Sequence, residues 1–176
     1  MANASIPVDE VRSRLLSDGL QFVRTARCIP GVLRIALIGS ITSSKVAPKD
    51  IDILVTVTDE GDLSSLAKAG RRLKGHTQSY NCGADIFLAN EEQHYIGRVC
   101  HWKECRFGIR TSCAARHCGR RPFLHDDIDD VCLSQQLVSA PPIELWPRRC
   151  CRIEVPSDVE QHLLSQLHRE PQSSAA

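Results

Sequence analysis

Aromatic residues, an excess charge of one sign and long apolar runs are all scarce in this 176-residue sequence. Aromatic side chains make up 5% of the chain, which argues against a protein that stacks bases along a single strand. Lys and Arg total 22 against 21 Asp and Glu, so the net charge of +1 argues against a histone-like binder held by charge alone. No apolar run approaches the roughly 18 residues that a transmembrane helix needs, so no membrane partner is expected.

The first residues contain no basic stretch followed by an apolar core, so no secretory signal is expected. We therefore expect a cytoplasmic, reducing environment, in which the nine cysteines are free thiols, metal ligands or redox groups. The length and the apolar fraction of 42% are typical of one globular domain, with or without a small appendage.

Up to residue 90, apolar periodicity and turn residues predict a compact unit of helices and strands. Helices are expected over 8–27, with a break allowed at 17–19, and over 62–73, ending at Gly75. Runs rich in branched residues predict strands over 32–38, 51–57 and 84–88. The predicted fold class is α/β (α+β), a small mixed sheet with flanking helices.

After residue 90 the composition changes. Residues 91–98 are expected to continue as a helix, and residues 98–121 carry seven basic side chains against one acid. The acids that follow, between 126 and 130, suit the first turn of another helix, and a Ser157-x-x-Glu160 capping box predicts a C-terminal helix. We predict a core over 1–90, a Cys/His/Arg-rich accessory segment with the C-terminal helix over 91–170, and a disordered tail over 171–176.

Two carboxylates stand at the start of the second predicted strand. Asp50 and Asp52 are two residues apart, so their side chains point to one face of a strand and repel each other. Mg²⁺ resolves such a conflict, because it prefers a few carboxylates together with waters and phosphate oxygens. A neighbouring strand could bring Asp85 to the same site. Each acid taken alone also has a simpler explanation: it could belong to a turn that leads into the strand, or it could be a charge that prevents an edge strand from pairing with another chain.

A glycine–serine pair follows the first predicted strand. Gly39 lets the backbone approach a phosphate, and the hydroxyl and N–H groups around Ser40 can hold its oxygens. Ser43 and Lys45, in the polar loop that follows, complete the expected nucleotide-binding set. With the acids, this set suits metal-assisted phosphoryl or nucleotidyl transfer, although an ordinary turn would explain Gly39 and Ser40 equally well.

Gly39-Ser40, nine further residues and then Asp50-x-Asp52 resemble the signature of the DNA polymerase β-like nucleotidyltransferase superfamily. Asp85 fits the third carboxylate of that superfamily, and the short spacing over residues 32–90 is most similar to its minimal nucleotidyltransferases. The resemblance implies Mg²⁺-dependent transfer of a nucleoside monophosphate, AMP from ATP in particular, to a hydroxyl on a protein, an RNA or a small molecule. It also implies that Asp50 and Asp52 bind both metals, that Asp85 binds the catalytic metal and helps to deprotonate the acceptor hydroxyl, and that Gly39 and Ser40 hold the triphosphate.

Four of the cysteines lie in the basic segment, in two pairs with four residues between the members of each pair: Cys100, Cys105, Cys113 and Cys118. Thiolates in paired groups, with His101 and His117 beside them, favour a structural Zn²⁺ site. Reduced cysteines that pack as small hydrophobes, or a redox pair, are the alternatives. The adjacent Cys150 and Cys151 could supply another ligand.

The basic charge of residues 98–121 suggests a second kind of function. These side chains could bind phosphates of nucleic acid or of a nucleotide, with Trp102 and Phe107 stacking on a base. A solvated basic surface, neutralised by the acids that follow, explains them as well. The alternative to an enzyme is therefore a catalytically inactive nucleotidyltransferase fold that binds nucleic acid or a protein partner through a zinc-stapled basic segment.

Overall fold

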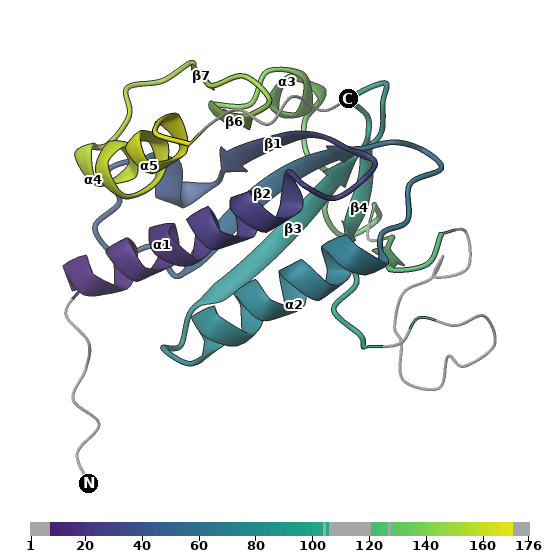
Figure 1. Ribbon diagram of the computed structural model, residues 1–176, viewed down its shortest axis with the longest axis horizontal. Coiled ribbons are helices and arrows are strands. Elements are labelled where there is room, and N and C mark those ends of the chain that lie inside the picture. The colour runs from purple at the N-terminus through teal and green to yellow at the C-terminus, as the bar shows by residue number, and fades with distance from the viewer. Residues whose placement is uncertain (1–7, 104, 106–120, 127, 171–176) are drawn as a thin grey trace, which may run out of the picture.

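The computed structural model describes residues 8–103, 105, 121–126 and 128–170 (Figure 1). Across these residues the chain forms a mixed α+β fold around a seven-stranded sheet of order β5-β4-β3-β2-β1-β6-β7. The strands are β1 (Val32–Ile38), β2 (Asp50–Val57), β3 (Gly83–Ala89), β4 (Tyr95–Val99), β5 (Leu124–His125), β6 (Ile143–Trp146) and β7 (Cys150–Cys151). The helical elements are α1 (Val8–Ala26), η1 (Ser40–Thr42), α2 (Ser64–Gln78), α3 (Gln135–Ser139), α4 (Ser157–Val159), η2 (Glu160–Leu164) and α5 (Ser165–His168). The mixed α and β class expected from the sequence is confirmed.

The central strands come from the first half of the chain and the edges of the sheet from the second half. β2 runs antiparallel to β1 and parallel to β3, with α2 as the crossover between the two parallel strands. β4 and β5 extend the sheet beyond β3, whereas β6 and β7 extend it beyond β1. Residue 90, where the composition changes, lies in the tight turn between β3 and β4, so strands from both sides of it share one sheet.

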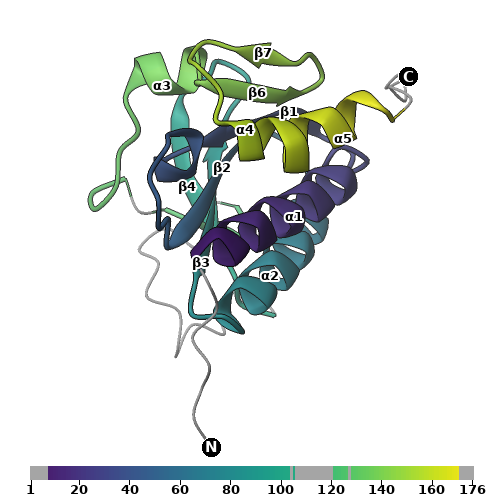
Figure 2. The ribbon, with the colours of Figure 1, turned by 90° about the vertical axis from the view of Figure 1, so that its left-hand side faces the viewer.

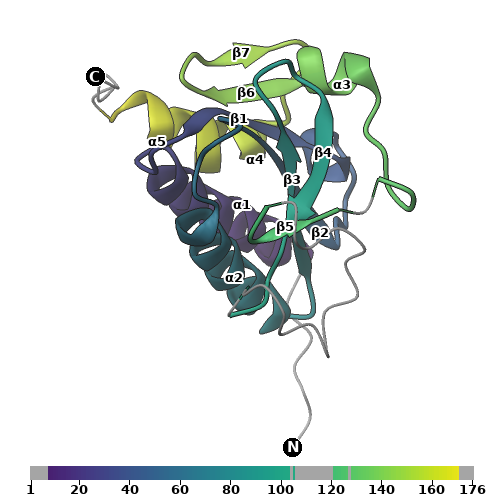
Figure 3. The same ribbon diagram turned by 90° about the vertical axis from the view of Figure 1, so that its right-hand side faces the viewer.

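Helices α1 and α2 lie together on one face of the sheet, and the C-terminal helical segment packs beside α1 (Figures 2 and 3). Alternate residues of the central strands, including Ile35, Ile51 and Ile86, are fully buried beneath these helices. The opposite face carries a second apolar cluster, in which Leu54 packs with Val138 of α3. None of the helices in the described part of the chain is long and apolar enough to cross a membrane.

The first predicted helix forms without the break allowed at 17–19. Gly19 lies inside α1, where a β-carbon would stand 2.5 Å from Cδ1 of Ile51, so this glycine lets the helix pack closely on β2. Gly75 does not end α2, which continues to Gln78. The C-terminal helix is confirmed as α4, η2 and α5, but the N-cap position is Pro156 and no side chain caps the helix there.

Two helices predicted in the accessory segment were wrong. Residues 95–99 form strand β4, because the open edge of β3 offers backbone hydrogen bonds that a short helix with Gly97 in it would forgo. The acids near residue 126 do not begin a helix: residues 128–130 form a turn, and the next helix, α3, begins at Gln135 with Ser134 as its N-cap. The predicted tail over 171–176 lies outside the described residues.

Candidate active site

The predicted carboxylates Asp52 and Asp85 lie side by side on the face of the sheet away from α1 and α2. They are direct partners in the parallel ladder of β2 and β3. Their chain neighbours Ile51, Ile53 and Ile86 are buried in the core beneath the helices, so the two acids point to the other face. The β2–β3 crossover therefore brings together residues that are 33 positions apart in the chain.

The carboxylate of Asp52 lies against the turn that follows β1. Gly39 has φ +73°, and a β-carbon there would stand 2.1 Å from Oδ2 of Asp52. Asp50 is exposed, and its carboxylate lies against Gly83 of β3. A β-carbon at Gly83 would stand 2.2 Å from Oδ1 of Asp50. Both acids therefore depend on a facing glycine that leaves room for a carboxylate.

Burial raises the pKa of Asp52 to about 6, and the negative charges of Asp85 and then Asp50 add to the rise. Asp50 and Asp85 are thus both close enough to Asp52 to act on its carboxylate electrostatically. The donor set consists of carboxylate oxygens, which fits Mg²⁺, and a cation would relieve the repulsion at Asp52.

The acids do not form a preassembled three-ligand cluster. Within the described residues, no group of three or more His, Cys, Asp or Glu side chains is arranged to hold a metal ion. Instead Asp85 pairs with Arg98 of β4, with Oδ1 3.4 Å from Nη1. A metal that uses Asp85 would have to share it with Arg98 or displace that side chain.

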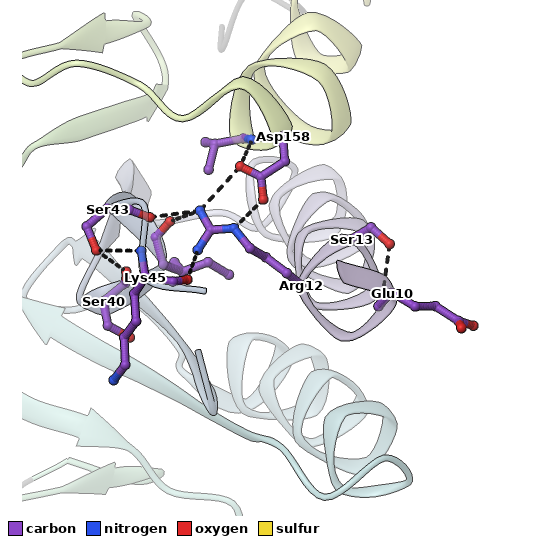
Figure 4. A network of polar contacts seen from close by, with 9 residues as sticks. Glu10, Arg12, Ser13, Ser40, Ser43, Lys45 and Asp158 are labelled. Carbon is purple, nitrogen blue, oxygen red and sulfur yellow. Dashed lines mark hydrogen bonds and ion pairs between the residues drawn. The ribbon is translucent and has the colours of Figure 1, made fainter. Parts of the chain in front are cut away.

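The predicted nucleotide-binding loop is ordered by its own polar groups. Ser40 begins the single turn of η1, and the backbone N–H and the hydroxyl of Thr42 both donate to the carbonyl of Gly39. The hydroxyl of Ser43 donates to the carbonyl of Ser40 at 2.8 Å. Lys45 is exposed and its side chain extends away from Arg12 (Figure 4). These four predicted residues, Gly39, Ser40, Ser43 and Lys45, thus lie on one short loop next to Asp52.

Arg12 of α1 holds this loop, and the sequence analysis missed it. Its guanidinium donates to the carbonyls of Ile41, Ser43 and Lys45 at 2.9–3.0 Å and pairs with Asp158 of α4 (Figure 4). Arg12 is 7% exposed. The spacing of the sequence did hold a signal for this residue. Leu15 and Leu16 follow Arg12 by three and four residues and are fully buried, so Arg12 lies on the apolar face of the helix.

The proposed zinc ligands are only partly described. Cys100 is buried and Cys105 is half-buried, whereas Cys113 and Cys118 lie outside the described residues. Cys150 and Cys151 form β7 at the opposite edge of the sheet from β4, which makes them poor substitutes as partners for Cys100. His117 and Phe107 also lie outside the described residues, and the zinc site stays a prediction.

Substitution of Gly39 by alanine is expected to destabilise the protein and to disturb Asp52. Gly39 has φ 73° and ψ −166°, a backbone conformation nearly confined to glycine that costs another residue about 1–3 kcal/mol, and the added methyl group forces the Asp52 carboxylate to move. Gly75→Ala is the matched control: its β-carbon meets nothing within 4 Å, and in α2 it should stabilise by about 0.5–1 kcal/mol. Urea unfolding of both variants checks this, and equal stabilities would contradict the close contact at Gly39.

Comparison of the chain with protein-family models, with curated proteins and with solved structures gives no match in any of the three.

Proposed function

We propose that this protein is a Mg²⁺-dependent nucleotidyltransferase that moves a nucleoside monophosphate, AMP from ATP in particular, onto a hydroxyl acceptor and releases pyrophosphate. The observation that carries the proposal is the position of Asp52, which lies beside Asp85 on a parallel strand and against the Gly39 turn. Two acids and a phosphate-compatible turn that meet at one place are what metal-assisted transfer to an α-phosphate needs.

Each residue then has a role that follows from its position. Asp50 and Asp52 would hold Mg²⁺, which supplies charge neutralisation at the triphosphate. The backbone at Gly39 lets phosphate oxygens approach, while Ser40 and Lys45 offer a hydroxyl and an ammonium donor from the same loop. The hydroxyl of Ser43 would have to leave the carbonyl of Ser40 before it could donate to a phosphate. Asp85, on the strand beyond Asp52, would accept the proton of the attacking hydroxyl.

The direct test uses ATP labelled at its α-phosphate, Mg²⁺, and separate pools of RNA, protein and small molecules as acceptors. Wild type is expected to label one pool and to release pyrophosphate, and Asp50→Asn/Asp52→Asn is expected to lower the rate by about 10²–10³-fold. Asp59→Asn/Glu60→Gln removes two exposed charges just after β2 and should leave the rate unchanged. The proposal fails if wild type transfers no label to any pool, or if the variant without Asp50 and Asp52 matches wild type.

The ion pair between Asp85 and Arg98 supports a second candidate, a nucleotidyltransferase-like fold that binds without turnover. In that case nucleic acid or a protein partner would be held by the basic segment that begins at Arg98, and binding would not depend on Asp52. Salt-sensitive binding that is equal in wild type and Asp52→Asn, with no transfer by either, would favour this candidate.

A further inference from the structure

A polar hollow of about 300 Å³ lies beside Asp85, and the function proposed above assigns no ligand to it. Lys74 of α2, Asp85 of β3, Arg98 of β4 and His125 of β5 line it, together with His101 and Trp102, which follow β4. Strand order separates it from the nucleotide-binding loop. Gly39 follows β1, on one side of the acids, whereas β4 and β5 lie on the other side.

The charged side chains around the hollow favour an anionic ligand. Among the described residues that line the hollow, Lys74 and Arg98 contribute two positive charges and Asp85 one carboxylate, which already pairs with Arg98. Arg71 adds a third cation close by, since its guanidinium donates to the carbonyl of Trp102 at 2.8 Å. A half-buried site with this balance of charge favours a phosphoester, which accepts several charge-assisted hydrogen bonds at once.

His101 gives an independent reason to expect a polar ligand. Both of its ring nitrogens are buried, and neither has a hydrogen-bond partner among the described residues. Leaving buried polar atoms unsatisfied is costly, and an imidazole has an N–H donor in either tautomer. A small turn of the ring toward an oxygen in the hollow would satisfy one of these atoms, because the terminal torsion of histidine is soft.

We propose that this hollow binds a phosphate group of the acceptor, so that the acceptor is a phosphorylated molecule whose reacting hydroxyl lies near its own phosphoester. This inference rests on the proposed function, because it assigns the nucleotide to the Gly39 side of the acids and the second substrate to the Arg98 side. Trp102, 50% exposed at the rim, offers a flat surface for a ring attached to that phosphate.

The test is a titration with inorganic phosphate at constant ionic strength, followed by NMR at the His101 ring resonance, which is assigned by its loss in His101→Asn. Wild type is expected to show a saturable shift that chloride does not produce. Lys74→Gln should weaken the apparent affinity about tenfold, the effect of losing one charged hydrogen bond. Lys68→Gln, an exposed lysine on the same helix outside the hollow, should change nothing.

Two further arms separate this inference from the function on which it rests. Asp50→Asn/Asp52→Asn should still bind phosphate, since the hollow does not include these acids. A non-hydrolysable ATP analogue with Mg²⁺ should leave the phosphate-induced shift in place, and competition would assign the hollow to the triphosphate instead. Absence of a saturable shift, or equal affinity in wild type and Lys74→Gln, would overturn the phosphate site even if nucleotidyl transfer is observed.

Discussion

Replacement of Arg12 by alanine is expected to lower the free energy of unfolding by about 3–5 kcal/mol, the range for breaking a buried ion pair by removing one partner. The Arg12 side chain is 9% exposed and that of Asp158 is 29% exposed, so the remaining carboxylate would lack both a partner and full hydration. The carbonyls of Ile41, Ser43 and Lys45 would also lose their donor. Urea unfolding monitored by circular dichroism measures the change.

Two controls sharpen the Arg12 prediction. Arg14→Ala, one half-turn along α1, removes an exposed arginine that pairs with Glu10, and it should cost no more than about 0.5 kcal/mol. Arg12→Lys keeps the charge but loses the planar fork, so it should recover only part of the stability. If Arg12→Ala were as stable as Arg14→Ala, the proposed stabilising contact of Arg12 with the loop of residues 41–45 and with Asp158 of α4 would be wrong.

Replacement of Asp52 by asparagine is expected to stabilise the protein at neutral and alkaline pH by about 1–3 kcal/mol. The raised pKa means that the folded state binds a proton at Asp52 more tightly than the unfolded state does. The cost of the charged form therefore appears as the pH rises from 3.8 through about 6 and is constant above that. Asparagine has no such charge, so the stability difference should be largest near pH 8 and vanish near pH 4.

The measurement is urea unfolding of wild type and Asp52→Asn at both pH values. Asp62→Asn is the control, because hydrogen bonds from Ser64 lower the pKa of that exposed carboxyl and its replacement should not stabilise. A stabilising effect of Asp52→Asn that is independent of pH would contradict the charge repulsion at Asp52.

Much of the α/β arrangement up to residue 90 could be predicted, because branched apolar runs and helical periodicity agree there with the final packing. The pairing of Asp52 with Asp85 could be expected from two strands joined by a helix, but the register that makes them direct partners required the structure. Strand β4 could not be predicted from its own residues, since the edge of β3 decides its conformation. Arg98 was counted only as one of many basic residues, and its contact with Asp85 depends on that same pairing.

The central claim, that the acids beside Gly39 hold a divalent cation together with a nucleoside triphosphate, can be measured without knowing the acceptor. Isothermal titration of an α,β-methylene ATP analogue into wild type should show binding that requires Mg²⁺. Binding to Asp52→Asn should be weaker by about tenfold or more, as expected when a charged partner is lost. Equal binding by the two proteins, or binding to wild type that ignores Mg²⁺, would contradict the account.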